Sequence, residues 1–483
     1  MKIYTLNPPY VSHFGRGMRW QDTARAGTLY YPIWLAYAVG VLEQAGFETR
    51  LVDAPAWNWD RKQVMEDIKR FEPDLIIMDS SFPSLSNDIS VGEEIKKSCP
   101  HIKIVLVGPP ASQFPDRILQ SQGIDIVARW EYDLTVREIA RALEARKPLQ
   151  EIKGISYKEK EEIIHNPSRE FTTSEDLDKI PFVSKVYKGH LNVRDYFLGN
   201  SLYPEVQVFT GRGCPFQCTF CSWPQTLMGR NYRVRSITNV LDEMEWIEQN
   251  LPQVKEVFLE DDTFTIDKKR VISFTEEYDR KGLDIVWACN ARADLDYDTM
   301  RKMKKTNCRL LIVGFESGSD EILQNIKKGI TVEDIKQFAR NAKRAGLLVL
   351  GDFIIGLPGE TKETIAMTRR LINEVTPDIL QVSVASPFPG TEFYRWAKTN
   401  GYLITDDPNE YLDEQGHQKS VVSYPWLSAR EIVEIVDGIL KNYYLSPRYI
   451  PIALRQVFRK DGWDEAQRIW IGARAFIKYV NRR

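Results

Sequence analysis

The stretch EVQVFTGRGCPFQCTFCSWPQ (Glu205–Gln225) joins an apolar strand to a turn-rich loop that holds three of the six cysteines of the chain. Cys214, Cys218 and Cys221 have the spacing C-x3-C-x2-C. Three thiolates supply three ligands, whereas a structural zinc site usually has four. An iron–sulfur cubane held by three thiolates keeps one iron open for an exogenous ligand, so the spacing favours such a cluster. A zinc site completed by a distant residue, or chance clustering, are the alternatives.

The strand before this loop opens a regular series of strands and helices. We expect strands at residues 205–210, 255–264, 284–294, 309–318, 348–360 and 379–390. Helices fill the intervals, at residues 236–249, 268–280, 297–306, 331–344 and 362–374. Six strand–helix units predict a partial parallel (βα)6 barrel of the TIM type over residues 201–400. Such barrels carry their sites at the C-terminal strand ends, where the cysteine loop lies.

Residues 1–145 show a second alternation. We expect strands at residues 1–7, 48–53, 74–79, 102–108 and 124–129, with helices between them. This pattern predicts an α/β domain with a Rossmann-like doubly wound parallel sheet, whose ligands bind at the strand ends. Neither GxGxxG after the first strand nor GxxxxGK[ST] is present, so we expect neither a dinucleotide nor a nucleoside triphosphate. Taken alone, the strand ends are better interpreted as ordinary strand-end turns.

Two further segments complete the chain. Residues 146–200 are expected to form a linker with a small hairpin, and residues 401–483 a helical cap with helices at 427–443 and 462–480. From Pro447 onward there are nine Lys or Arg against three Asp or Glu, with several aromatic residues among them. A basic, aromatic helix suits an anionic membrane surface or a cover over a lipid-like substrate. The interpretation that the sequence favours is a capping helix with a solvated basic face.

Composition bounds the class of protein. With 483 residues, 43% of them hydrophobic and 27% charged, the chain has the makeup of a globular protein of two or three domains. The net charge of −2 argues against nucleic-acid binding over the whole surface. No apolar run reaches 18 residues, and the start MKIYTLNPPY reads as a strand and a turn, so we expect a cytoplasmic protein. Cys99, Cys289 and Cys308 lie alone, without the spacing of a disulfide framework.

The cysteine loop and the barrel pattern resemble the radical S-adenosylmethionine (radical SAM) superfamily. The resemblance implies that Cys214, Cys218 and Cys221 hold a 4Fe-4S cluster. It also implies that S-adenosylmethionine chelates the open iron through its amine and carboxylate. Reductive cleavage then yields a 5′-deoxyadenosyl radical, with a reductant such as a flavodoxin or ferredoxin as partner.

The resemblance assigns further contacts to S-adenosylmethionine. Phe220 matches the aromatic residue near adenine, and LEDD (Leu259–Asp262) stands where the family often has Gly-Gly-Glu. Because the sequence departs from that pattern, this segment contacts the ligand either through its side chains or through its backbone carbonyls. Arg292 suits a carboxylate, with a surface ion pair to Asp294 as the alternative. The implied contacts are Phe220, Glu260, Asp261, Asp262, Arg292, Glu316, Ser317 and Gly356.

A Rossmann-like domain ahead of such a barrel resembles the cobalamin-binding subgroup. The motif D-x-H-x-x-G is absent, because Val11 stands where Asp would be needed before His13. We therefore expect cobalamin bound without a histidine ligand from that motif; loss of cobalamin is the alternative. The implied contacts are the strand-end residues Pro9, Asp53, Ser80, Ser81, Gly108 and Pro109.

The resemblance implies a reaction class and leaves its kind open. The first hypothesis is methylation of an unactivated carbon of a small-molecule or lipid substrate. The alternatives are a radical rearrangement, ring contraction or cyclisation without methyl transfer, and a non-catalytic iron–sulfur scaffold. The segment RWQDTARAGTLYYPIWLAYAVGVLEQAG (Arg19–Gly46) faintly resembles members associated with hopanoid biosynthesis. This resemblance favours a lipid substrate and, with the basic tail, a peripheral membrane contact.

Overall fold

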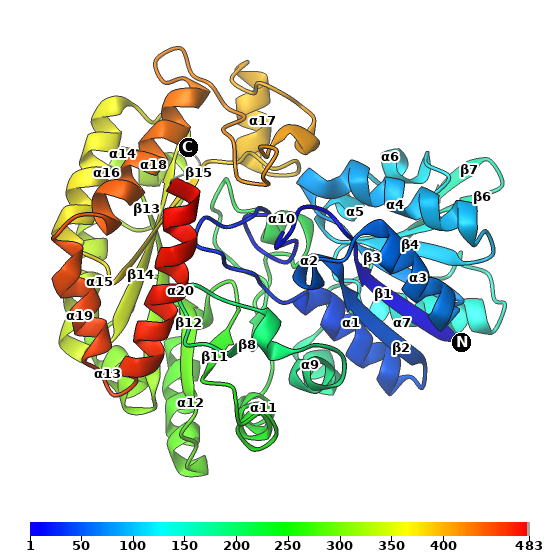
Figure 1. Cartoon of the computed structure of the whole chain (residues 1–483), viewed down its shortest axis with the longest axis horizontal. Coiled ribbons are helices and arrows are strands. Elements are labelled where there is room, and N and C mark those ends of the chain that lie inside the picture. Colours follow the sequence, from blue (N-terminus) through cyan, green and yellow to red (C-terminus); the bar gives the residue numbers. More distant parts are fainter. Residues whose placement is uncertain (481–483) are drawn as a thin grey trace.

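The computed structural model describes residues 1–480 and contains two parallel β-sheets (Figure 1). The N-terminal sheet with its helices is blue to cyan, the second sheet is green to yellow, and the last helices, in orange and red, lie against the second sheet. Both sheets and the terminal helices agree with the predicted fold class. Arg482 and Arg483, which contributed to the basic count of the C-terminal segment, lie outside the described residues.

The first sheet has seven strands in the order β2-β1-β3-β4-β5-β6-β7. The first five are parallel, as predicted, and their apolar sequences are buried on both faces, as in β3 (LIIMD). The strands are β1 (Lys2–Asn7), β2 (Glu48–Asp53), β3 (Leu75–Asp79), β4 (Lys103–Val107), β5 (Ile126–Ala128), β6 (Ile155–Glu159) and β7 (Glu162–His165). The helices are α1 (Ile33–Gln44), α2 (Ala54–Trp57), α3 (Arg61–Phe71), α4 (Leu85–Ser98), α5 (Pro109–Gln113), α6 (Pro115–Leu119) and α7 (Asp133–Glu144).

The predicted linker contributes to this sheet. Its hairpin, β6 and β7, pairs antiparallel with β5 and extends the sheet to His165. The rest of the segment carries two short helices, α8 (Ser174–Lys179) and α9 (Val183–His190). The sequence pattern indicated the hairpin, but its pairing with β5 is a long-range contact that a local pattern does not reveal.

Helix α1 lies in the core between the two sheets. All ten residues from Ile33 to Leu42 are buried, and the helix packs against α7 and α9. A helix that is apolar all round needs partners on every side. Trp34 accordingly contacts Phe209 and Trp223 of the barrel, with ring centroids 5.0 and 6.3 Å apart. One continuous hydrophobic core therefore spans both domains.

The second sheet is an open half-barrel of six parallel strands in chain order, β8-β11-β12-β13-β14-β15. Its strands are β8 (Glu205–Val208), β11 (Glu256–Leu259), β12 (Val286–Ala291), β13 (Cys308–Glu316), β14 (Leu348–Ile355) and β15 (Ile379–Val384). A short ladder of β9 (Gly211–Arg212) and β10 (Arg233–Val234) stands apart. The helices are α10 (Trp223–Thr226), α11 (Ile237–Asn250), α12 (Lys268–Lys281), α13 (Tyr297–Lys305), α14 (Asp320–Asn325), α15 (Val332–Ala345), α16 (Lys362–Val375) and α17 (Glu392–Thr399).

Two parts of the chain cover the second sheet where outer helices do not. The connection between β1 and α1 pairs with residue 197 through Leu29, and Tyr30 packs on the apolar cluster that includes Leu310 and Leu350. Three C-terminal helices follow, α18 (Ala429–Tyr444), α19 (Tyr449–Val457) and α20 (Gly462–Val480). Helix α18 contacts β14 and β15, and Figure 1 shows α20 in front of the sheet. Within residues 1–480, no helix has the length and apolar character needed to span a bilayer.

A buried ion-pair network anchors α20 to the half-barrel. Arg309 at the start of β13 is 2% exposed and donates to Glu256 of β11 and to Glu465 of α20 over 2.8–3.1 Å. Both carboxylates are fully buried. Buried charges are tolerated when they are paired and hydrogen-bonded, so this network fixes where α20 lies.

Replacing Arg309 with Ala should therefore destabilise the protein strongly. It leaves the carboxylates of Glu256 and Glu465 buried without Arg309, which costs about 3–5 kcal/mol of unfolding free energy. Thermal and urea unfolding of the purified chain measure the effect. Arg301→Ala is the matched control: this arginine is 59% exposed and 3.8 Å from Asp298, so its loss should change stability by about 0.5 kcal/mol or less. Equal melting of both variants would contradict the anchoring role.

Candidate active site

Strand pairing and a glycine fix the backbone at the base of the cysteine loop. It runs between β9 and β10, whose pairing closes the loop at Arg212 and Arg233. Gly213 has φ +88°, and a Cβ there would lie 2.1 Å from the carbonyl oxygen of Asn231, so only glycine fits. Burial raises the pKa of Cys214 to about 11, so metal binding to this thiol is coupled to release of its proton.

The three thiols line one cavity of about 690 Å³. Within residues 1–480, no group of three or more His, Cys, Asp or Glu is arranged to hold a single metal ion. The donor set of three thiolates facing an open cavity fits a cluster that must also accept an outside ligand. The cavity reaches Met18 and Trp20, which lie in the connection leading out of the first sheet.

The acidic segment after β11 carries three carboxylates, those of Glu260, Asp261 and Asp262, and each makes different contacts. Asp261 is buried and accepts hydrogen bonds from the Thr210 amide at 2.6 Å and the Gly211 amide at 3.0 Å, which fixes the start of the cysteine loop. Asp262 lines the cavity, and its Oδ2 has no hydrogen-bond partner among the described residues. Burial raises the pKa of Asp262 to about 6, against the opposing effect of Arg19. An orphaned, buried carboxylate oxygen fits an ammonium ligand.

Arg19 reaches this strand end from the β1–α1 connection and was not among the sequence-predicted site residues. Its guanidinium pairs with Glu260, donates to the carbonyl oxygen of Asp261 at 3.1 Å, and lies 4.4 Å from the ring centroid of Trp223. Glu260 is fully buried and does not line the cavity. The only sequence signal for Arg19 was its position at the head of the Arg19–Gly46 segment.

Arg292 joins the cysteine loop to the next strand end. Its guanidinium stacks 3.6 Å from the ring centroid of Phe216, and it donates to the carbonyl oxygen of Lys328 at 3.0 Å. Its Nε makes no hydrogen bond within residues 1–480, although the Asp294 carboxylate lies 3.6 Å away. Arg292 is 7% exposed and lines the cavity, while the Asp294 carboxylate beside it is 53% exposed, so the contact of Arg292 with S-adenosylmethionine stays a prediction.

Glu316 and Lys328 form a buried pair in the cavity wall. Glu316 ends β13 in the left-handed conformation, with φ +63°, and accepts from the Lys328 ammonium at 2.6 Å. Asp352, in β14, lies on the same wall, and its Oδ1 has no hydrogen-bond partner in the described chain. Burial and the Glu316 charge raise the pKa of Asp352 well above its usual range. Lys328 and Asp352 were not predicted, because neither carries a local motif.

Four of the eight predicted S-adenosylmethionine contacts lie outside the cavity lining: Glu260 and Asp261, described above, and Ser317 and Gly356. Ser317 is fully buried, and its Oγ accepts from the Ser319 amide at 3.2 Å, which shapes the turn after β13. Gly356 has φ +98° after β14, and its amide donates to the Glu360 carboxylate. The carbonyl of Gly356 accepts from the Tyr424 hydroxyl at 2.7 Å. Phe220, in contrast, lines the cavity with the cysteines.

The strand-end residues of the first sheet meet at one edge and bond to one another. Asp53 accepts from Asn7 at 2.8 Å and from Tyr196 at 2.9 Å, and Ser80 donates to Asp88 at 2.9 Å. The hydroxyls of Ser81 and Ser84 are hydrogen-bonded at 2.6 Å, and the carbonyl of Pro9 accepts from Asn87 at 2.9 Å. Gly108 packs on the Ser80 carbonyl, and Pro109 begins α5. None of these residues lines the large cavity. Their contact with cobalamin stays a prediction.

Comparison with known proteins identifies the family. The radical SAM superfamily matches residues 208–372, and the B12 binding domain matches residues 21–140. The chain belongs to the B12-binding radical SAM superfamily. As in its homologues, its cofactors are a 4Fe-4S cluster, S-adenosylmethionine and cobalamin. The predicted family and cofactors are thereby confirmed.

Individual relatives differ in their reactions. The chain is 29% identical to an uncharacterized methyltransferase of Pyrococcus horikoshii, over 96% of each chain. It is 28% identical to an anaerobic magnesium-protoporphyrin IX monomethyl ester cyclase of Cereibacter sphaeroides, over 92% of this chain and 70% of the relative. It is 25% identical to a hopanoid C-3 methylase of Methylococcus capsulatus, over 85% and 80% of the two chains, which confirms the resemblance to hopanoid-associated members.

A solved structure supports the fold. The radical S-adenosylmethionine methyltransferase TsrM from Kitasatospora setae, with cobalamin and [4Fe-4S] cluster bound, superposes with a TM-score of 0.73. The two chains are 16% identical, and the match covers 99% of each. The arrangement of a Rossmann-like sheet, a half-barrel and C-terminal helices is therefore confirmed as the fold of this chain.

Replacing Cys218 with Ala should prevent cluster assembly, because two thiolates do not replace the three-ligand set. Anaerobically reconstituted protein should drop from about four irons per chain to near none and lose S-adenosylmethionine cleavage. Iron assay and visible absorbance measure the loss. Cys99→Ala, at the end of α4 in the first domain, is the matched control and should load normally. Full iron content in the Cys218 variant would refute the cluster assignment.

Replacing Arg292 with Ala should weaken S-adenosylmethionine binding about tenfold to a hundredfold, the usual worth of a hydrogen bond to a charged group. Titration calorimetry on cluster-loaded protein measures the dissociation constant. Because Arg292 also stacks on Phe216, the iron content must be shown to be unchanged. Arg292→Lys keeps the charge without the planar fork and should recover affinity only in part. Unchanged affinity in the Ala variant would remove Arg292 from the site.

Proposed function

We propose that the chain is a radical SAM C-methyltransferase that methylates an unactivated carbon of a substrate with a large apolar part. The observation that supports this proposal is the distribution of polar and apolar residues in the cavity of about 690 Å³. Its cysteine end holds Asp262, Arg292 and Glu316, and its remaining wall is mostly apolar, as at Leu198, Ile312, Leu350, Leu440 and Phe476. A polar cosubstrate and an apolar substrate can therefore share one enclosure.

In this proposal, each polar group at the cysteine end has a task toward S-adenosylmethionine. The orphaned oxygen of Asp262 accepts from its ammonium, and the guanidinium of Arg292 binds its carboxylate. Glu316 accepts from the ribose hydroxyls, and Phe220 packs on adenine. Asp261 positions the loop through Thr210 and Gly211 without touching the ligand.

The protein groups bind, orient and shield. When bound, the cluster and S-adenosylmethionine supply a carbon radical that removes a hydrogen atom, and cobalamin supplies the methyl transfer. Asp352 lines the cavity with an Oδ1 that is unpartnered within residues 1–480, and burial raises its pKa, so this carboxyl hydrogen-bonds to a polar group of the substrate and orients it. The apolar wall keeps water from the reacting carbon.

Each methyl transfer needs two S-adenosylmethionine and two electrons, so an external reductant is part of the proposal. One S-adenosylmethionine yields 5′-deoxyadenosine and methionine, and the other yields S-adenosylhomocysteine and the methyl group. The cysteine loop is exposed at Pro215 and Gln217, between the first two ligands. We place the approach of a flavodoxin- or ferredoxin-type donor there, because electron transfer requires a short path to the cluster.

A radical cyclisation without methyl transfer is the second candidate. The identity to the Cereibacter sphaeroides cyclase supports it. The methyltransferase relative supports the first candidate, since it matches 96% of both chains, whereas the match spans only 70% of the cyclase. A non-catalytic scaffold is disfavoured, because it has no need of unpartnered polar atoms beside the cysteines.

Product stoichiometry distinguishes these reactions. Holoenzyme with a reductant, trideuteromethyl S-adenosylmethionine and an extract of candidate substrates should yield a product carrying one CD3 group. S-adenosylhomocysteine and 5′-deoxyadenosine should form in amounts equal to that product. Mass spectrometry of the products measures all three. Deoxyadenosine coupled to an unlabelled product, without homocysteine, would establish cyclisation or rearrangement instead.

A further inference from the structure

The exposed apolar side chains of the molecule concentrate on its last two helices. Seven of the ten large hydrophobic residues exposed within residues 1–480 lie between Leu445 and Ile477. Phe458 and Trp463 are the most exposed of all, at 83% and 84%. Contiguous exposed apolar surface is uncommon on soluble proteins and usually marks an interaction site.

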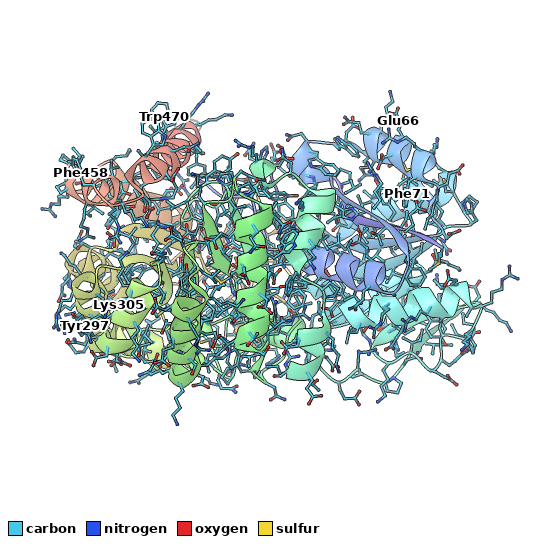
Figure 2. All side chains as sticks on the ribbon, turned by 90° about the horizontal axis from the view of Figure 1, so that it is seen from below. Glu66, Phe71, Tyr297, Lys305, Phe458 and Trp470 are labelled. Carbon is cyan, nitrogen blue, oxygen red and sulfur yellow. The ribbon has the colours of Figure 1, made fainter. Side chains whose placement is uncertain are left out.

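Helical spacing gathers these side chains on one face of each helix. Ile450, Leu454 and Phe458 follow one another at intervals of four in and just after α19. Trp463, Trp470 and Ile477 follow at intervals of seven in α20. The two helices pack together, and Figure 2 shows Phe458 and Trp470 on neighbouring outer helices at one end of the molecule. These six residues define the α19–α20 face.

The exposed charges that the C-terminal segment contributes to this face have one sign, although Lys460 also pairs with the exposed Asp284 and Arg455 with the buried Asp378. Between Leu445 and Val480, the exposed charged residues are all cationic: Arg448, Arg455, Lys460, Arg474 and Lys478. The nearby acidic residues are turned away, since Glu465 is buried against Arg309, and Asp461 and Asp464 are only half-exposed. The α19–α20 face is therefore apolar and aromatic within a cationic surround.

The large cavity opens at this face. Ile450, Leu454 and Ile477 are 47–58% exposed and also line the cavity that holds the three cysteines. Leu445, at the end of α18, is 57% exposed and also lines the cavity. The mouth of the cavity is thus rimmed by apolar side chains that belong both to the surface and to the interior.

We propose that the α19–α20 face docks on an anionic lipid bilayer and that an amphiphilic substrate passes from the bilayer through the rimmed mouth into the cavity. The inference rests on the proposed function for the chemistry, but not for the docking. Tryptophan and phenylalanine partition into the headgroup region, and each Lys or Arg near an anionic surface strengthens binding further. Apolar insertion and charge attraction together give the two signals that stable peripheral binding needs.

Charge complementarity favours a bilayer over a second copy of the chain. A two-fold contact through this face would set the cationic surround of one copy against that of the other, which is repulsive. An anionic surface instead attracts these cations, of which Arg455 and Lys460 also pair with Asp378 and Asp284. A hydrophobic substrate also has its highest concentration in the bilayer, where the mouth would be placed.

Vesicle co-sedimentation of the holoprotein, without reductant, tests docking apart from turnover. Vesicles of phosphatidylcholine with phosphatidylglycerol should bind the protein about tenfold or more tightly than phosphatidylcholine alone, and added salt should weaken binding. The exposed substitutions Phe458→Ser, Trp463→Ser and Trp470→Ser together, or Arg474→Glu with Lys478→Glu, should each reduce binding about tenfold.

Matched controls lie elsewhere on the surface. Lys69→Glu with Lys97→Glu makes the same charge change on α3 and α4, and Ile404→Ser removes an exposed apolar residue outside the face; both should bind like the wild type. Equal losses in controls and test variants, or no preference for anionic vesicles, would overturn docking. A dimer that the Phe458, Trp463 and Trp470 substitutions dissolve would assign the face to self-association instead.

Photocrosslinking tests the passage of the substrate. Vesicles containing a phospholipid with a diazirine on its acyl chain should label peptides of the deep cavity, such as those with Leu198 or Ile312, after illumination. Labels confined to the outer side of α19 and α20 would overturn passage into the cavity. Vesicle binding without any CD3-labelled product would instead count against methyl transfer alone, so the two proposals fail separately.

Discussion

Two buried carboxylates of the first domain, Glu131 and Asp133, hold the cysteine loop of the second. Arg212 at the start of the loop pairs with Asp133 at 2.6 Å, and Arg233 at its end pairs with Glu131 at 2.8 Å. All four side chains are at least nine-tenths buried. Unpaired, any of these charges would be costly in this environment, so the loop and the first domain hold each other in register.

Helix α1 extends the same constraint through the core. Its Trp34 lies 4.6 Å from the Arg212 guanidinium, and the Tyr37 hydroxyl accepts from the Phe209 amide at 3.0 Å. The helix therefore packs on the sheet of one domain and on the cysteine loop of the other. The two domains share a core rather than a hinge, and the distance between their cofactor sites is set by packing.

The sequence was informative where chemistry is local. The spacing of the cysteines, the strand periodicity and the acidic end of β11 are short-range patterns, and the structure gathers Cys214, Asp262 and Arg292 around one cavity. It was uninformative where contacts join distant segments. Arg19 pairs with Glu260, which lies 241 residues later in the chain, and no sequence motif predicts this pair. Helical periodicity likewise predicted α20, but the outward direction of Trp463 and Trp470 depends on the whole fold.

The polar groups at the two candidate cofactor edges differ in a way that separates structure from function. At the first sheet, Asp53 and Ser80 form hydrogen bonds with neighbouring side chains. Beside the cysteines, Asp262 and Asp352 keep buried oxygens without partners within residues 1–480. Orphaned polar atoms destabilise a fold unless a ligand satisfies them, so these two carboxylate oxygens favour a ligand that donates hydrogen bonds at the cysteine end.

In the two proposals, electrons enter at the cysteine loop and the substrate enters at the α19–α20 face. The cysteine loop is exposed at Pro215 and Gln217, whereas the cavity opens between Leu454 and Ile477. A reductant bound over the loop would leave the mouth free, and a bilayer at the mouth would leave the loop accessible. The separation also suits radical chemistry, because the apolar mouth admits a greasy substrate while it disfavours water. An enzyme with a single shared opening would have to release one partner before it could accept the other.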